Sequence, residues 1–166
     1  KMDEWRNNFK GIRFIDEEAG YNFGGAVDDI WQKPSGELIV VDVKSTSKNI
    51  FDWEDTYSKW EYAKGYQRQL EMYQWLLEKN GFEVASEGYL VYYNGKKHEP
   101  MFNQQLTFDL HLVRLECDNS WVEEAVLNAK ATLDGDMPKP ARSCENCNYL
   151  RKRWEVSQKD PNKIID

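Results

Sequence analysis

The pattern of apolar and polar residues predicts three consecutive strands near the start of the chain. Gly11–Asp16 and Gly25–Lys33 read as strands, separated by a glycine-rich turn around residues 20–24. Glu37–Lys44, with the sequence ELIVVDVK, is the most apolar of the three. Ser45–Thr56 contains strand-breaking Asn, Asp and Ser residues and has no clear period, so we expect a loop there.

The rest of the chain predicts two helices with two strands between them. The first helix runs from about Tyr57 to Lys79 and ends at Asn80-Gly81, a common C-terminal stop. Strands are predicted at Val84–Tyr93 and within Gln104–Cys117, and the second helix covers about 118–135. The order β-β-β-α-β-β-α indicates an α/β fold with a mixed central sheet flanked by helices.

The length and composition fit one packed domain over residues 1–166. Its expected parts are a core sheet with the long helix over 11–117, the helix at 118–135, and a tail at 136–166 that carries Cys144 and Cys147. Aromatic residues make up 14% of the chain, which excludes general disorder. No apolar run approaches the ~20 residues of a membrane span, and the cysteines are few. A soluble, cytoplasmic protein is therefore expected.

The overall charge does not favour binding to nucleic acid. The net charge is −7 and the isoelectric point is near 5.0. A nucleic-acid-binding chain normally shows a basic surface, so any such function must depend on local charge or on a bound metal ion.

The best-specified turn in the chain is Pro34-Ser35-Gly36, between the second and third strands. Pro suits the first position of a type I turn and Gly the left-handed position after it, so a three-residue hairpin loop is predicted. The register that follows pairs Lys33 with Glu37, Ile30 with Val40, Asp28 with Asp42, and Ala26 with Lys44.

This register places two carboxylates side by side on a largely apolar face. Asp42 and Lys44 share that face because side chains alternate along a strand. Carboxylates of directly opposite residues repel each other unless a positive charge lies between them, and a hard cation such as Mg²⁺ or Mn²⁺ would supply it. The alternative is a simple salt bridge from Lys44 to Asp28 or Asp42 at a solvated edge.

The long helix carries one polar side chain within its predicted apolar stripe. Gln69 lies in that stripe, four residues before Tyr73, and a buried amide needs a partner. The other members of the stripe are Tyr62, Tyr66, Leu76 and Leu77.

Three short motifs occur in order along these elements: Gly25-Ala-Val-Asp28, Asp42-Val-Lys44, and Gln69-Leu-Glu-Met-Tyr73. In this order, on strand, strand and helix, they closely resemble the PD-(D/E)xK nuclease superfamily. The nearest branch is similar to the RecB-type nucleases, including CRISPR-associated adaptation nucleases. The resemblance covers about Gly11–Lys79 and extends through the tail to about Arg153.

The resemblance implies a restriction-endonuclease-like core and a metal-dependent deoxyribonuclease that is exonuclease-like and acts in repair, recombination or defence. It implies Asp28, Asp42 and the Val43 carbonyl as ligands of Mg²⁺ or Mn²⁺. It also implies that Lys44 activates water or stabilises the phosphate, and that Gln69 and Tyr73 orient the site or contact DNA. DNA and a larger nuclease/helicase or defence complex are the implied partners.

The chain departs from the family pattern in two places. Family members have an N-terminal helix with a His or Glu that completes the metal shell, whereas only the short segment Met2–Phe9 precedes the first strand here. Iron–sulfur members use four cysteines, of which only Cys144 and Cys147 have counterparts, so no intact cluster is expected. Zinc held with His98, His111 or Cys117 is the alternative to a plain buried thiol pair.

Two other function classes compete with the nuclease. One is a non-catalytic module that binds DNA ends or a protein partner. The missing N-terminal ligand and the incomplete cysteine set favour it, whereas the polar residues Asp28, Asp42, Lys44, Gln69 and Tyr73 in apolar surroundings oppose it. A thiol redox site at Cys144-x-x-Cys147 is disfavoured because that motif lies in a proline-rich tail. Aromatic residues within Phe51–Tyr57 are expected to pack in the core, and Lys96-Lys97-His98 and Arg151-Lys152-Arg153 to be solvated.

Overall fold

The computed structural model describes residues 1–98 and 104–159 and divides the chain into two compact units, Lys1–Asn128 and Ala129–Asp166. The elements of the first unit begin with α1 (Met2–Trp5), β1 (Ile12–Asp16), β2 (Tyr21–Gly25), β3 (Asp29–Gln32) and β4 (Leu38–Thr46). They continue with α2 (Trp53–Lys59), α3 (Glu61–Lys79), β5 (Glu87–Gly95) and β6 (Phe108–Glu116). The boundary between the units falls within α4 (Val122–Asp134), and α5 (Glu145–Lys159) belongs to the second unit.

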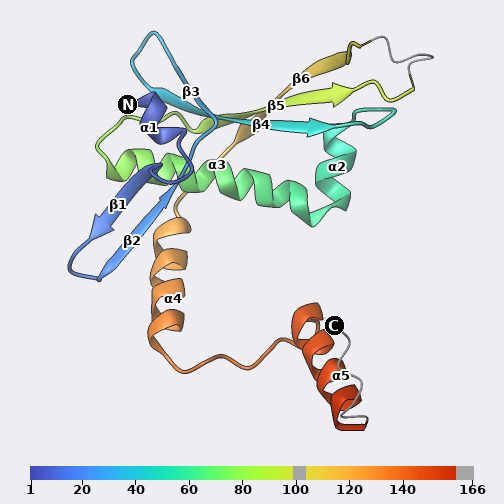
Figure 1. Cartoon of the computed structure of the whole chain (residues 1–166). Coiled ribbons are helices and arrows are strands. Elements are labelled where there is room, and N and C mark those ends of the chain that lie inside the picture. The colour runs from blue at the N-terminus through green and yellow to red at the C-terminus, as the bar shows by residue number, and fades with distance from the viewer. Residues whose placement is uncertain (99–103, 160–166) are drawn as a thin grey trace. The chain divides into compact units, whose positions relative to one another are not determined.

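A four-stranded mixed sheet forms the centre of the first unit, in the order β3-β4-β5-β6. β3 and β4 are antiparallel, β4 and β5 are parallel, and β5 and β6 are antiparallel. α2 and α3 lie on one side of this sheet (Figure 1). The predicted α/β fold with a mixed sheet and flanking helices is confirmed.

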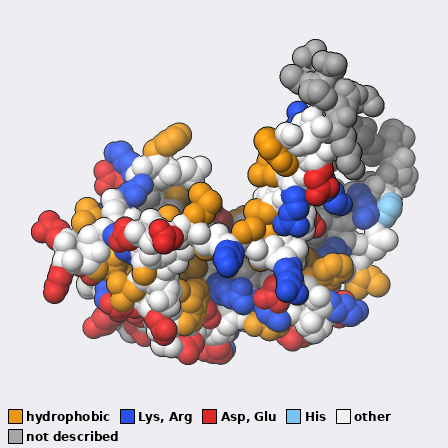
Figure 2. Space-filling model, turned by 90° about the horizontal axis from the view of Figure 1, so that it is seen from below, with side chains coloured by type: hydrophobic (Ala, Val, Ile, Leu, Met, Phe, Trp, Pro, Cys, Tyr) orange, Lys and Arg blue, Asp and Glu red, His pale blue; other side chains and the backbone are white. Residues whose placement is uncertain are grey.

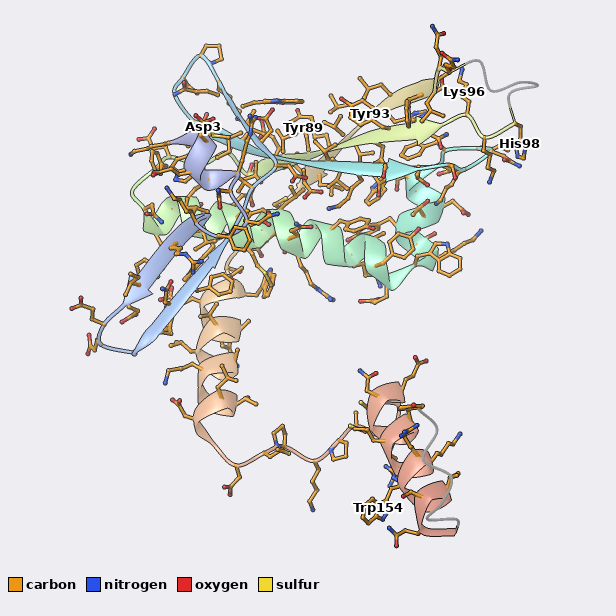
Figure 3. All side chains as sticks on the ribbon, in the orientation of Figure 1. Asp3, Tyr89, Tyr93, Lys96, His98 and Trp154 are labelled. Carbon is orange, nitrogen blue, oxygen red and sulfur yellow. The ribbon has the colours of Figure 1, made fainter. Side chains whose placement is uncertain are left out.

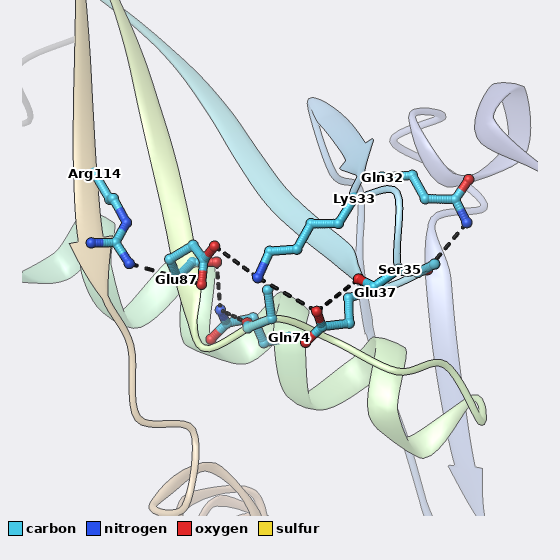
Figure 4. Close-up of polar contacts among 9 residues, drawn as sticks. Gln32, Lys33, Ser35, Glu37, Gln74, Glu87 and Arg114 are labelled. Carbon is cyan, nitrogen blue, oxygen red and sulfur yellow. Dashed lines mark hydrogen bonds and ion pairs between the residues drawn. The ribbon is translucent and has the colours of Figure 1, made fainter.

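The hairpin between β3 and β4 has the predicted register as far as the pair Asp29–Val41, whereas the predicted pairs Asp28–Asp42 and Ala26–Lys44 lie beyond the end of the ladder. Gly36 adopts a left-handed φ of 102°, and its N–H donates to the Lys33 carbonyl at 2.9 Å. The Lys33 N–H donates to the Glu37 carbonyl at 2.9 Å, and Ile30 pairs with Val40. Lys33 also contacts Glu87 at 2.9 Å, as part of a polar network that joins the hairpin to β5 (Figure 4). The turn chemistry therefore fixed which residues face each other.

The first predicted strand, Gly11–Asp16, is confirmed as β1, but the turn and the strand that follow it differ from the prediction. Tyr21–Gly25, expected as a turn, is strand β2, and it pairs with β1 in a separate two-stranded sheet. The turn lies earlier and ends at Gly20, whose φ is 70°. The glycines of β2 have a packing role that the sequence did not show, because a Cβ on Gly25 would lie 2.8 Å from the Tyr73 ring. The predicted strand at 25–33 is therefore two segments, of which only β3 belongs to the main sheet.

The predicted loop and long helix also differ. β4 extends to Thr46, and α2 begins inside the predicted loop because the Asp52 side chain caps it by accepting the Asp55 N–H at 2.9 Å. Trp60 then takes an extended conformation, φ −122° and ψ 118°, and separates α2 from α3. No Pro or Gly marks this break between residues 53 and 64, so periodicity alone missed it.

The core lies between the sheet and α3. Leu70, Leu76 and Leu77 are fully buried against Val40 and Leu90. The predicted stripe is rotated, because Tyr62 is 45% exposed while Glu71 and Gln74 are buried. Tyr73 lies at the edge of the contact, where its hydroxyl accepts a hydrogen bond from the Gln69 amide, whereas aliphatic side chains occupy the centre.

The opposite face of the sheet is largely bare within the described chain. Tyr89 and Tyr93 lie on the side away from α3 (Figure 3). Several apolar side chains of this face are more than a third exposed: Trp31, Val43, Tyr93, Phe108, Leu110 and Leu112. Figure 2 views the molecule from below, from the side of α3, and there too hydrophobic side chains reach the surface beside Lys and Arg.

The tail of the chain contains a helix that was not predicted. α5 begins directly after Cys144, and the Cys147 N–H donates to the Cys144 sulfur at 3.4 Å. The Cys144-x-x-Cys147 motif therefore lies at the start of a helix. This corrects the expectation that it lies in an irregular proline-rich tail, on which the argument against a redox role depended. Hydrogen bonds from Cys147 lower the pKa of the Cys144 thiol.

One buried carboxylate joins α3 to the segment before α4. Glu71 is 5% exposed and accepts hydrogen bonds from the Trp121 indole at 2.7 Å, the Asp118 N–H at 3.2 Å and the Gln67 amide at 3.0 Å. Three donors satisfy its charge, so the contact is structural.

Replacing this carboxylate should destabilise the fold strongly. Glu71→Ala removes the acceptor of the Trp121 indole and the Asp118 N–H and one of the two acceptors of the Gln67 amide, and we expect a loss of about 3 kcal/mol or more in the free energy of unfolding by urea. Glu78→Ala, on the exposed side of the same helix, is the matched control and should cost less than about 1 kcal/mol. Equal losses in the two variants would contradict a structural role for Glu71.

Candidate active site

Asp42 and Lys44 lie in the middle of the sheet on the side of α3. Asp42 is 1% exposed, and its Oδ2 lies 2.5 Å from the Lys44 Nζ. Both residues belong to β4, where alternation puts them on the same face as the core residue Val40. The pair is therefore an ion pair in largely apolar surroundings.

Lys44 also contacts two side chains of α3. Its Nζ donates to the Gln69 Oε1 at 3.2 Å and lies 4.6 Å from the centre of the Tyr66 ring. The Gln69 amide in turn donates to the Tyr73 hydroxyl at 3.2 Å. A continuous set of polar contacts thus runs from Asp42 through Lys44 and Gln69 to Tyr73, and it gives the amide the partners that its position requires.

Asp28, which directly precedes β3, contacts the backbone of β4. The ladder between β3 and β4 ends at the pair Asp29–Val41, so Asp28 and Asp42 are next in register beyond it. The Asp28 Oδ2 accepts the Val43 N–H at 2.8 Å in place of a backbone carbonyl. This contact fixes the carboxylate beside the backbone that follows Asp42.

The N-terminal segment holds the Asp28 turn from the other side. The Arg6 guanidinium donates to the Asp28 carbonyl at 2.9 Å and contacts the Asp29 carboxylate at 2.5 Å. The Trp5 carbonyl accepts the Val27 N–H at 3.1 Å. Sequence reasoning missed Arg6, because nothing in its local sequence distinguishes it from any other basic residue near the N-terminus.

The Asp42 carboxyl has a perturbed pKa. Burial raises its pKa above the ordinary value, Lys44 opposes the shift, and the nearby Asp28 carboxylate adds to it. Its Oδ2 is buried and makes no hydrogen bond of normal geometry within the described residues, although Lys44 lies close. A buried anionic oxygen with an unused lone pair suits a hard cation such as Mg²⁺ or Mn²⁺.

The comparison with protein-family models decides the assignment. The model of the PD-(D/E)XK nuclease superfamily matches residues 1–151. The chain belongs to the PD-(D/E)XK nuclease superfamily. No curated protein and no solved structure matches it.

Members of this superfamily are usually nucleases that use divalent metal ions. In this chain, no group of three or more His, Cys, Asp or Glu side chains is arranged to hold a metal among residues 1–98 and 104–159. Asp28 and Asp42 thus supply two side-chain carboxylates without a third. The donors fit an oxygen-preferring cation in kind, and a backbone carbonyl or water would have to complete the set.

The other predicted sites are less suited to chemistry. Burial raises the pKa of the Cys117 thiol to about 12, and His111 stacks on Phe51 with ring centres 4.1 Å apart. His98 contacts the Asn49 side chain at 2.9 Å. These three zinc-ligand candidates each have other partners. Phe51 packs against the core as expected, and residues 151–153 are exposed.

Within the part of the chain that the structure describes, no helix is long and apolar enough to cross a membrane.

The raised pKa of Asp42 predicts a pH-dependent stability difference. A folded-state pKa above the ordinary value of 3.8 means that protonated Asp42 favours folding, and this contribution is lost as pH rises through the folded pKa. In EDTA, Asp42→Asn should gain stability relative to the native chain as pH increases from about 4 to 7. Urea unfolding at several pH values measures this.

Asp136→Asn, at an exposed site, is the control and should show a flat difference over the same pH range. A flat difference for Asp42→Asn as well would show that its pKa is not raised.

Proposed function

We propose that this protein is a metal-dependent deoxyribonuclease that hydrolyses phosphodiester bonds at Asp28, Asp42 and Lys44. The observation that carries the proposal is the contact series from buried Asp42 through Lys44 and Gln69 to Tyr73. Burying charged groups is costly for folding, so such clusters are often retained at functional sites, and membership of a nuclease superfamily supports that role here.

The residues would divide the work as follows. Asp28, Asp42 and the Val43 carbonyl would hold Mg²⁺ or Mn²⁺, which supplies positive charge against the phosphate when bound. The Lys44 ammonium donates to a phosphate oxygen or to the attacking water, from a position set by Asp42 and Gln69. Tyr73 fixes the Gln69 amide, so this pair keeps the Lys44 ammonium aimed at the site.

One observation favours a second function. The described residues offer no third metal-binding side chain beside Asp28 and Asp42, which fits a non-catalytic module that binds DNA ends or a protein. Four finer points stay predictions. They are exonuclease-like cleavage, action within a larger nuclease/helicase or defence complex, membership of the RecB-type branch, and a single domain over 1–166.

Removal of the lysine separates the two functions. Lys44→Ala should lower the rate of DNA cleavage in Mn²⁺ by about two to three orders of magnitude, because it removes one electrostatic stabiliser of the transition state. Labelled single-stranded and duplex DNA with Mn²⁺ or EDTA provide the assay. Lys33→Ala, which removes another ion-paired lysine of the same hairpin, is the control and should cleave normally.

Full activity of Lys44→Ala, or cleavage by the native chain in EDTA, would contradict the proposed mechanism.

Metal binding can be measured without cleavage. Mn²⁺ should raise the melting temperature of the native chain, by an amount equivalent to about 2.7 kcal/mol at 100 times the dissociation constant. Asp28→Asn and Asp42→Asn should abolish this shift, whereas Asp136→Asn should keep it. A shift that survives in both site variants would place the metal elsewhere.

A further inference from the structure

An exposed aromatic pair lies at the corner between α2 and α3. Trp60 is 54% exposed and Tyr62 is 45% exposed. Their rings stack with centres 6.2 Å apart and an angle of 30° between planes. The extended conformation of Trp60 separates the two helices and brings its ring onto Tyr62 rather than into the core.

A third ring, that of Tyr66, connects this pair to the candidate active site. The Tyr62 ring meets the Tyr66 ring edge-on at 5.6 Å, and the Tyr66 ring lies 4.6 Å from the Lys44 Nζ. Three aromatic rings therefore form a row that starts in solvent at Trp60 and ends at the lysine paired with Asp42. We call Trp60, Tyr62 and Tyr66 the aromatic row.

A pocket of about 180 Å³ opens beside the row. Tyr62 and Tyr66 form part of its wall, together with Trp53, Tyr92 and Lys48. The Lys48 ammonium is held there by the Thr56 hydroxyl at 2.6 Å. The pocket thus combines flat aromatic faces with a positioned cation.

The exposed end of the row differs from the aromatic residues that pack in the core, which include its third member, Tyr66. Phe51, Trp53 and Tyr92 pack against one another and belong to the core cluster, whereas Trp60 and Tyr62 lie outside it. Single exposed aromatics need no explanation, but a stacked pair that leads to a charged site is a feature of surfaces that bind flat ligands.

The charges around the row are mostly paired. Glu61 contacts both Lys64 and Arg68, and Asp55 contacts Lys59 at 2.5 Å. Among the described residues around the row, Lys48 has no carboxylate partner, and Lys44 is paired with Asp42. Binding at this surface must therefore depend on stacking more than on phosphate contacts.

We propose that the aromatic row is a stacking platform for unpaired bases, which leads a single strand of DNA to Asp42 and Lys44. The inference rests on the proposed function. Bases in a duplex already stack on one another, whereas an unpaired base offers a free face to Trp60 and Tyr62. Each base stacked on an aromatic side chain strengthens binding by about 5-fold to 100-fold.

Binding assays in EDTA test the platform without cleavage. Fluorescence anisotropy of labelled DNA, titrated with the full chain, should show tighter binding to a strand of 12 thymidine nucleotides than to a 12-base-pair duplex or an abasic strand of 12 units. Trp60→Leu and Tyr62→Leu should each weaken binding to the strand by about 10-fold. Trp31→Leu removes another exposed tryptophan, on the bare face of the sheet, and should leave binding unchanged.

The dependence on salt gives a second readout. Contacts to about two phosphates predict a slope near −1.4 for log affinity against log salt, well below that of an extended basic surface. Urea unfolding checks that each variant is folded.

The two proposals fail in different ways. Equal affinity for the thymidine strand, duplex and abasic strand, or unchanged binding in folded Trp60→Leu and Tyr62→Leu, would overturn the platform even if DNA is cleaved. Selective binding that both variants lose would support the platform, and if Mn²⁺ then gave no cleavage, only the nuclease proposal would fail.

Discussion

The candidate active site depends on the buried ion pair between Asp42 and Lys44. Burying these two charges has a cost in the free energy of folding. Removing Asp42 and Lys44 from water is costly, and their attraction compensates only if further contacts satisfy both groups. Gln69 and the Tyr66 ring supply those contacts for the lysine, while the Asp42 oxygen beside Lys44 makes no further hydrogen bond among the described residues. The position of α3 over the sheet, and therefore the packing of the core, brings these partners together.

The parts of this arrangement that local chemistry specifies could be predicted from the sequence. Pro34-Ser35-Gly36 sets the hairpin register, and the register places Asp28 and Asp42 directly beyond its last pair, Asp29–Val41. Alternation along β4 puts Lys44 on the same face. The position of Gln69 within a helical stripe required a polar partner, which the structure provides.

The remaining parts depend on contacts between distant segments. The break at Trp60 lacks a Pro or Gly signal, and the turn at Gly20 is one of several glycine positions that fit equally well. Arg6 acts through residues more than twenty positions away. Neither periodicity nor propensity reports such contacts, so both the boundaries and this positioning residue were missed.

The N-terminal segment controls whether the proposed third metal ligand is available. The Lys33–Glu37 hydrogen bond sets the alternation of the hairpin, in which Val27 and Val43 would form a later hydrogen-bonded pair. That pair does not close, because Val27 donates to Trp5 and Val43 donates to Asp28. The Trp5 carbonyl thus competes with the Val43 carbonyl as the acceptor of the Val27 N–H, and Val27 donates to Trp5. α1, a helix of only four residues, thus acts on the proposed site through one backbone hydrogen bond, from the Val27 N–H to the Trp5 carbonyl.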